Sequence, residues 1–261
     1  MSVTPPERAR LSELVRTPYI GVLTYPKISL RTAKSRITQL EKLNVDVLVF
    51  EGKTRLGRLG ILGLGTVSVV VKAEAESRVY ALKIRRTDAN RPSMDGEWKL
   101  TSYANRLGIG PALESHSRDF ILMQALEYTE LYDWFKGLRG PGSRSSAREM
   151  VHVVLNQCRK LDIMGLDHGQ LSNLRKHAVV AGGRPWLIDF ESASLARKPK
   201  NVTAAAQNLL IGGRMSSLVR RLIGAKETKP LLTLLGEYKE ENSDIAYSRL
   251  LDFVGVAGKK H

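Results

Sequence analysis

Side chains that could bind a nucleotide phosphate follow one another between residues 63 and 97. The segment GLGTVSVVV begins with Gly63 and Gly65 and includes Ser68. Glycines have no Cβ, so backbone N–H groups beside them can come close to phosphate oxygens. Lys83 ends the run YALK, and Glu97 follows in a helical segment. Because a buried lysine is costly without a phosphate or carboxylate partner, we expect Lys83 to pair with Glu97 beside a bound phosphate.

A polar segment follows a short apolar run at residues 186–192. In WLIDFES the apolar residues 186–188 lead to Asp189 and Phe190, which resemble the start of the DFG motif of protein kinases, and this resemblance implies that Asp189 holds Mg²⁺. In an extended segment Glu191 would point to the same side as Asp189. Glu191 could supply a second metal oxygen, but a salt bridge to a basic neighbour is the favoured interpretation.

The loop GLDHGQLSNLRKH, residues 165–177, contains Asp167, Gln170 and Asn173 among its polar side chains. The Gln170 amide can orient a hydroxyl by hydrogen bonding but cannot take its proton as a carboxylate does. The kinase resemblance implies that a carboxylate base is missing at Gln170, that Asp167 could partly replace it, and that Asn173 could offer an oxygen to a metal ion. The competing interpretation is an ordinary helix exit with incidental histidines.

A sheet and a set of helices are expected to position these residues. Short β-branched runs from residue 45 to 83, separated by glycines and charged turns, predict antiparallel sheet. A helix ending at Gly108, a buried strand over 119–127 and a basic, turn-rich crossing over 136–148 follow. The remainder is mostly helical. A sheet followed by helices indicates an α+β fold.

The order of these motifs resembles the protein-kinase superfamily. The glycine loop, the lysine of YALK, the glutamate in the next helix and the aspartate of DFES follow one another as in kinases. HGQL resembles the HGDL or HxDL loop of RIO kinases, of the small kinase of the KEOPS tRNA-modification complex and of aminoglycoside phosphotransferases. Residues from about 52 to 215 are most similar to a group of archaeal predicted serine/threonine kinases.

The resemblance implies a bilobal fold and roles in binding ATP and Mg²⁺. The lysine would grip the α and β phosphates, the glutamate would orient the lysine, and adenine would lie against the strand end near residue 123. The residues implied for ATP binding are Gly63, Gly65, Ser68, Lys83, Glu97, Met123 and Ala125. The residues implied for the metal are Asp189 and Asn173. The residues implied for catalysis are Lys83, Asp167, Gln170 and Asp189.

Two positions depart from the kinase pattern. Gln170 stands where kinases carry the catalytic aspartate, and Arg175 stands where they carry a metal-binding asparagine, so Asn173 comes two residues early. Losing a general base costs on the order of 10² to 10⁴ in rate, but phosphoryl transfer depends mainly on positioning and charge neutralisation. In this family type His168 braces the loop. We therefore expect a divergent loop that retains activity.

The chain is expected to have three parts: a helical N-terminal extension over 1–50, an N-lobe with one helix over 51–127, and a reduced, mostly helical C-lobe over 128–261. In the extension, Ser29 is the expected N-cap of a helix with apolar residues from Leu30 onward along one face. Arg36 is among the basic residues assigned to the opposite, solvent face. A winged-helix-like unit is the alternative interpretation of this segment.

Basic residues also follow the aspartate of DFES. Arg197, Lys198 and Lys200 could bind phosphate or an acidic acceptor, and a solvated turn is an equal alternative. Over the whole chain 41 Lys and Arg face 26 Asp and Glu, a net charge of +15. This excess favours polyanionic partners such as RNA or a ribonucleoprotein, although a solvated charged surface explains it as well.

Cysteine and hydropathy exclude several classes of function. The single Cys158 cannot form an internal disulfide and is expected to be a packed thiol. No apolar run is long enough to span a bilayer, and MSVTPPERAR lacks the apolar core of a signal peptide. We therefore expect a cytoplasmic protein without membrane contact.

Three functions remain in competition. The leading hypothesis is an atypical ATP-dependent serine/threonine protein kinase that transfers the γ-phosphate to a protein hydroxyl, its own included. The second is a nucleotide-binding pseudokinase or ATPase module in an RNA-associated complex. The third, a small-molecule phosphotransferase, is disfavoured because the C-terminal part is short and lacks acidic clusters for cationic substrates.

Overall fold

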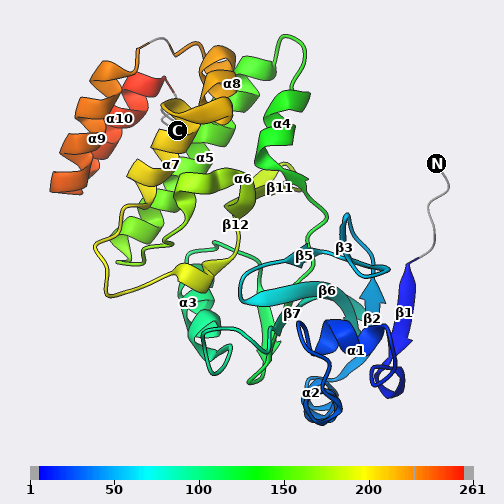
Figure 1. Cartoon of the computed structure of the whole chain (residues 1–261). Coiled ribbons are helices and arrows are strands. Elements are labelled where there is room, and N and C mark those ends of the chain that lie inside the picture. The colour runs from blue at the N-terminus through cyan, green and yellow to red at the C-terminus, as the bar shows by residue number, and fades with distance from the viewer. Residues whose placement is uncertain (1–5, 226, 256–261) are drawn as a thin grey trace. The chain divides into compact units, whose positions relative to one another are not determined.

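The chain is α+β, as predicted, with an antiparallel sheet region followed by a mostly helical region (Figure 1). The computed structural model describes residues 6–225 and 227–255. Two units are present, the first formed by Met1–Ser102 with Pro111–Leu126 and the second by Tyr103–Gly110 with Glu127–His261. In the described part of the chain, no helix combines the length and the apolar character that crossing a membrane requires.

The first unit is built on one antiparallel sheet in the order β1-β2-β6-β7-β9-β8, with β5 paired to β6. A separate hairpin joins β3 and β4. The predicted β-branched runs form the central strands, where valines and isoleucines pack well on a pleated surface. The strands are β1 (Glu7–Arg10), β2 (Val45–Phe50), β3 (Thr54–Leu56), β4 (Leu59–Ile61), β5 (Gly63–Leu64), β6 (Ser68–Ala75), β7 (Arg78–Arg85), β8 (Leu113–His116) and β9 (Phe120–Gln124).

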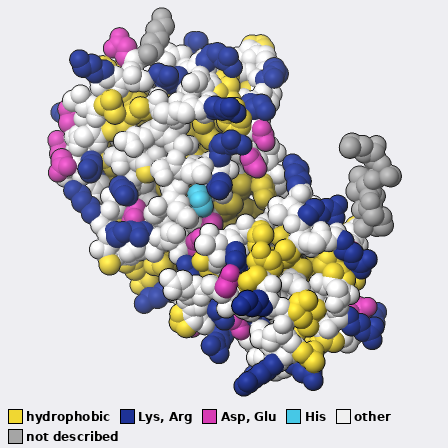
Figure 2. Space-filling model, viewed as in Figure 1, with side chains coloured by type: hydrophobic (Ala, Val, Ile, Leu, Met, Phe, Trp, Pro, Cys, Tyr) yellow, Lys and Arg dark blue, Asp and Glu magenta, His cyan; other side chains and the backbone are white. Residues whose placement is uncertain are grey.

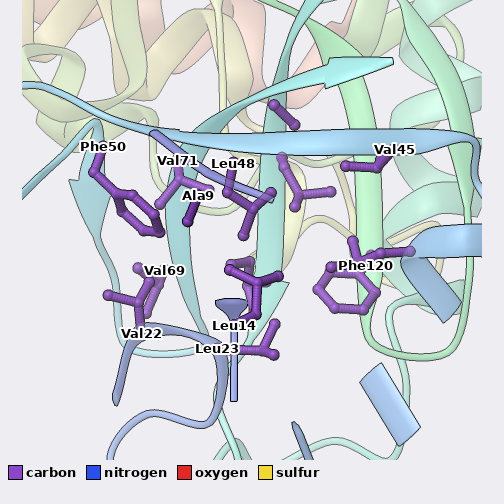
Figure 3. Packing of buried hydrophobic residues seen from close by; sticks show 14 of the residues in the cluster. Ala9, Leu14, Val22, Leu23, Val45, Leu48, Phe50, Val69, Val71 and Phe120 are labelled. Atoms are coloured by element: carbon purple, nitrogen blue, oxygen red, sulfur yellow. The ribbon is translucent and has the colours of Figure 1, made fainter. Parts of the chain in front are cut away.

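The N-terminal segment is part of this sheet and its core, which differs from the separate helical extension expected over residues 1–50. β1 is a strand, and it pairs with β2 because the outer edge of β2 offers unpaired backbone groups. Figure 3 shows Leu14 and Leu23 among the same buried side chains as Leu48 and Phe120 of the sheet. Burial of these apolar side chains against the sheet therefore joins the N-terminal segment to the first unit.

Helix α2 (Leu30–Lys42) begins where the sequence predicts, because the Ser29 side chain accepts a hydrogen bond from the Thr32 N–H. Its buried face is rotated from the prediction. Leu30 is 51% exposed, whereas Arg36, assigned to the solvent face, is 1% exposed. The assignment of Arg36 to solvent is wrong.

Arg36 is buried because the first unit supplies acceptors for both terminal nitrogens of its guanidinium. It donates to the carbonyl oxygens of Leu23 and Arg85 and, at 3.2 Å, to Asp119 Oδ1. Gln39 donates to the other oxygen of Asp119 at 2.9 Å. Burial lowers the pKa of Arg36, and the Asp119 carboxylate opposes that effect. The network fastens α2 to the end of β7, two residues beyond Lys83.

The remaining helices of the first unit are short or shared. Helix α1 (Tyr19–Leu23) precedes α2, and α3 (Asp95–Asn105) begins in the first unit and ends in the second.

The second unit contains a three-stranded sheet in the order β10-β11-β12. Its strands are β10 (Thr129–Glu130), β11 (Ala178–Ala181) and β12 (Arg184–Leu187). Its helices are α4 (Leu131–Gly137), α5 (Ser143–Ile163), α6 (Leu174–His177), α7 (Asn201–Leu210), α8 (Gly213–Ile223), α9 (Lys229–Glu241) and α10 (Asp244–Val254).

Helix α5 is the central helix of the second unit. It starts at Ser143, and α4 ends at Gly137, so most of the crossing predicted over 136–148 is helical instead. Cys158 lies on its buried face as predicted, and burial raises the pKa of this thiol. Arg159 donates to Tyr238 of α9 at 3.1 Å and to Asp244 of α10 at 2.9 Å. These contacts anchor the α9–α10 hairpin to α5.

The positive charge is spread over the surface. Figure 2 shows Lys and Arg side chains distributed over the visible surface of both units. The RNA or ribonucleoprotein contact suggested by the net charge of +15 stays a prediction.

Candidate functional site

The glycine segment forms a tight hairpin in the first unit. Gly63 pairs with Val70 across β5 and β6, and the Gly65 N–H donates to the Ser68 carbonyl at 2.8 Å. Gly65 is exposed at this turn, whereas Ser68 is buried in the strand. The turn is held by Arg86, whose guanidinium donates to the Gly65 carbonyl at 2.9 Å. No sequence pattern indicates this role of Arg86, because its contact depends on β7 lying beside the turn.

The predicted pairing of Lys83 with Glu97 is confirmed. Lys83 lies on β7 opposite Val70 of β6, and its Nζ forms an ion pair with Glu97 Oε1 of α3. The two residues are 5% and 4% exposed. Arg91 Nη1 lies 3.6 Å from the second oxygen of Glu97. A lysine and a glutamate are thus buried together at the start of α3.

Asp95, the less favoured partner for this lysine, is exposed, unlike Glu97. It lies on the surface at the beginning of α3, accepts a hydrogen bond from Ser93 at 2.7 Å and lies 3.4 Å from His116. Met123 and Ala125, the residues implied for adenine, lie at the end of β9 and just after it. Both side chains are partly exposed, and Met123 pairs with Ala81 of β7.

His168 braces the candidate catalytic loop of the second unit. Its ring is fully buried, its Nε2 donates to the Ile188 carbonyl at 3.1 Å, and its centroid lies 4.7 Å from that of Phe190. Burial, reinforced by the neighbouring His177, lowers the pKa of His168 to about 4. His168 is therefore neutral near pH 7 and links the loop to the strand that delivers Asp189.

Asn201 and Asp162 hold the other side of this loop. Asn201 accepts from the His168 N–H at 2.8 Å and donates to the Leu166 carbonyl at 2.8 Å. Asp162 receives the Asn201 N–H at 2.9 Å and the Asn201 side-chain amide at 2.7 Å. Burial raises the pKa of Asp162, and the hydrogen bonds that its carboxylate accepts partly offset this rise. Sequence reasoning missed both residues, because they meet only when the start of α7 packs against α5.

Asp167, the candidate substitute base, is paired with Arg197. It is buried, forms an antiparallel bridge with Ser194, and accepts from Arg197 Nε at 2.8 Å. Arg197 also donates to the Ser192 carbonyl, and both groups lie close to the position that a Cβ on Gly169 would take. Arg197 therefore pairs with Asp167 inside the loop, while its side chain stays 50% exposed, and phosphate binding by this residue stays a prediction.

Gln170 and Asn173 have different environments. The Gln170 Oε1 atom is buried, and no donor in the described part of the chain reaches it. Asn173 ends the 3-10 turn Leu171–Asn173, and its side chain is exposed. A buried acceptor without a donor indicates a place where a ligand hydroxyl or water would bind.

Asp189 adopts a left-handed backbone conformation, φ +70°, at the start of the 3-10 turn Phe190–Ser192. Its Oδ2 lies 3.8 Å from His177 Nδ1. The segment is not extended, so the expectation that Glu191 points with Asp189 is wrong. A left-handed aspartate is uncommon and is often held at functional sites by its surroundings.

A metal ion would find few protein ligands here. Across residues 6–225 and 227–255, no group of three or more His, Cys, Asp and Glu side chains could hold one. Asp189 supplies one carboxylate. That donor set fits Mg²⁺, which commonly binds through one or two carboxylates and takes its other ligands from phosphates and water.

Comparison with known proteins gives a relative without an assigned activity. No family model matches the chain. Over 94 residues, 35% of this chain and 80% of the relative, it is 30% identical to Uncharacterized protein MJ1211 of Methanocaldococcus jannaschii. The chain belongs to the family of this archaeal protein. Because the name of that relative carries no activity, the function is argued from the geometry.

Proposed function

We propose that the chain is an atypical, RIO-like ATP-dependent protein kinase that transfers the γ-phosphate of ATP to a serine or threonine hydroxyl. In this proposal the first unit is the N-lobe and the second unit the reduced C-lobe of a kinase-like fold. ATP supplies the phosphoryl group and Mg²⁺ neutralises its charge when both are bound.

The observation that carries the proposal is the buried ion pair of Lys83 and Glu97. Removing two charges from water costs several kcal/mol per ion, and packed apolar side chains at the same positions would often be equally stable. A costly pair of this kind is better explained by binding than by folding. Lys83 would bind the ATP phosphates, and Glu97 would orient its ammonium group.

The second unit supplies residues with complementary roles. Asp189 would hold Mg²⁺ with its carboxylate. Gln170 would orient the acceptor hydroxyl, which the buried and unpaired Oε1 atom favours. Asp167 would act mainly by positioning the loop, since its carboxylate already accepts the Arg197 N–H. Without a free carboxylate base we expect slow turnover, on the order of 10² to 10⁴ below that of a kinase with one.

The test is phosphate transfer from labelled ATP and Mg²⁺ to the chain itself and to a generic protein acceptor. Asp189→Ala is expected to abolish incorporation, and Lys83→Met to reduce it to background. Asp252→Ala, an exposed aspartate of α10, is the matched control and is expected to leave incorporation unchanged. Equal incorporation by the unaltered chain and Asp189→Ala would refute the kinase proposal.

A pseudokinase is the second candidate, and one observation favours it. Gln170 replaces the expected catalytic carboxylate, while the nearby Asp167 is engaged by Arg197. A pseudokinase would be stabilised by ATP, by about 2.7 kcal/mol at a hundredfold excess over Kd, without phosphate incorporation. Both candidates predict stabilisation by ATP in thermal unfolding, so phosphate incorporation measured on the same samples separates them.

A further inference from the structure

A cavity of about 400 Å³ lies in the second unit beside the candidate catalytic loop. Its walls come from the loop, from the first turns of α7 and from one face of α9. Two loop residues that line it, Gly169 and Leu171, are the chain neighbours of Gln170. A molecule held in this cavity would therefore lie next to the group proposed to orient the acceptor hydroxyl.

The charge of the cavity walls favours an anionic occupant. Lys200 and Lys239 line it, and both are exposed. Neither ammonium forms an ion pair with another described residue. Asp167 is the one carboxylate among the lining residues, and its charge is matched by Arg197. Two lysines at one cavity without carboxylate partners attract acidic groups and repel basic ones.

The apolar part of the cavity favours a protein segment over a nucleic acid. Leu171 and Leu235 are buried in its walls, and Leu232 is 49% exposed beside them. No Phe, Tyr or Trp occurs among the lining residues, so the cavity offers no surface on which a base could stack. The leucines can pack against an apolar side chain of a bound peptide, and the two lysines can bind an acidic side chain next to it.

Gly236 keeps space free in front of this cavity. It lies inside helix α9, where glycine is less favourable than alanine by about 1 kcal/mol. A Cβ at this position would meet nothing within 4 Å, and its φ is not in the left-handed region. Neither packing nor backbone conformation therefore requires a glycine here. An occupant that approaches the helix closely accounts for it.

We propose that this cavity binds an acidic segment of the protein acceptor, with Lys200 and Lys239 recognising carboxylates close to the accepting serine or threonine. This inference rests on the proposed kinase function and adds a substrate class to it. The apolar side chain of the segment packs on Leu232 and Leu235, and its backbone passes Gly236.

The test measures peptide binding to the full chain without ATP. Two fluorescein-labelled peptides share a serine between two leucines; one is flanked by aspartates and glutamates, the other by lysines and arginines. Fluorescence anisotropy in about 0.1 M salt is expected to show tighter binding of the acidic peptide by at least about tenfold. Equal binding of the two peptides would overturn the proposal.

Charge-reversal variants distinguish binding of the acidic peptide in the cavity from its general attraction to a positively charged protein. Lys200→Glu with Lys239→Glu is expected to weaken binding of the acidic peptide at least about tenfold. Lys160→Glu with Lys229→Glu changes the net charge equally at exposed positions outside the cavity, and binding is expected to stay within about twofold. Equal losses in the two double variants would assign the binding to net charge and reject the cavity.

A substitution that fills the cavity with a large side chain tests the binding site without changing the charge. Gly236→Trp is expected to block the cavity and abolish preferential binding, while Thr233→Trp, exposed on the same helix but outside the lining, is expected to retain it. Retained binding in Gly236→Trp would also reject the cavity. Circular dichroism on all variants verifies folding, and the comparison of the two peptides on the unaltered chain stands without any variant.

The outcome is separable from that of the proposed function. Loss of peptide preference with phosphate incorporation that depends on Asp189 would reject the acidic acceptor and keep the kinase. Peptide binding that depends on Lys200 and Lys239, in a chain that incorporates no phosphate, would keep the docking cavity and reject transfer.

Discussion

His168 makes the stability of the second unit depend on pH. Its pKa is lowered from 6.5 to about 4 by burial and by the neighbouring His177. Between these values the unfolded chain binds a proton that the folded chain does not, so the free energy of unfolding falls as pH falls. The two pKa values give a loss of about 2 kcal/mol between pH 8 and pH 5.

Replacing His168 by glutamine tests this magnitude. A glutamine amide can still donate to the Ile188 carbonyl but does not titrate. The loss of unfolding free energy between pH 8 and pH 5 is therefore expected to be about 2 kcal/mol smaller in His168→Gln than in the unaltered chain. The neighbouring His177 and Asp189 are present in both proteins.

The assay is urea unfolding at the two pH values, followed by tryptophan fluorescence in a Trp98→Phe background. The remaining tryptophans, Trp134 and Trp186, then report on the second unit. His152→Gln changes a histidine of α5 outside the loop and is expected to keep the full pH-dependent loss. Identical pH dependence in His168→Gln and the unaltered chain would show that His168 is not the buried, neutral brace described above.

Three further predictions concern stability. Arg36→Met is expected to lower the unfolding free energy of the first unit by about 2–4 kcal/mol, because two carbonyl oxygens and the Asp119 carboxylate each lose one donor, whereas the exposed Lys34→Met on the same helix should change it by less than about 0.5 kcal/mol. Gly169→Ala is expected to cost about 1–3 kcal/mol, because Gly169 has φ +84° and a Cβ would lie 2.6 Å from Arg197 Nη2; an unchanged urea midpoint would contradict this. Asp162→Asn is expected to cost about 1–3 kcal/mol and to speed amide exchange at the start of α7, and protection equal to that of the unaltered chain would count against the network.

Local patterns in the sequence predicted several elements accurately. The β-branched runs became β2, β6 and β7, since alternating branched side chains favour a pleated, buried surface. Ser29 capped α2 because a serine oxygen accepts an N–H of the first turn wherever such a helix begins. The pairing of Lys83 with Glu97 was predictable because a lysine within a buried strand needs a charged partner.

Interactions between distant segments were not predictable. Arg36 has the same charge as its solvent-exposed neighbours, and only the carbonyls of Leu23 and Arg85 and the carboxylate of Asp119 make its burial favourable. The N-terminal strand became part of the sheet because the edge of β2 could pair with it.

The sequence by itself determined the α+β class, the order of the candidate motifs and the chemistry that each side chain can offer. Tertiary structure alone decided which groups remain accessible for that chemistry. Asp167 and Lys200 are both ionisable residues near the same loop, yet Asp167 is held by Arg197, whereas Lys200 lines an open cavity. Residue type sets what a side chain can bind, but its partners and burial are set by segments far away in the chain, which no local pattern encodes.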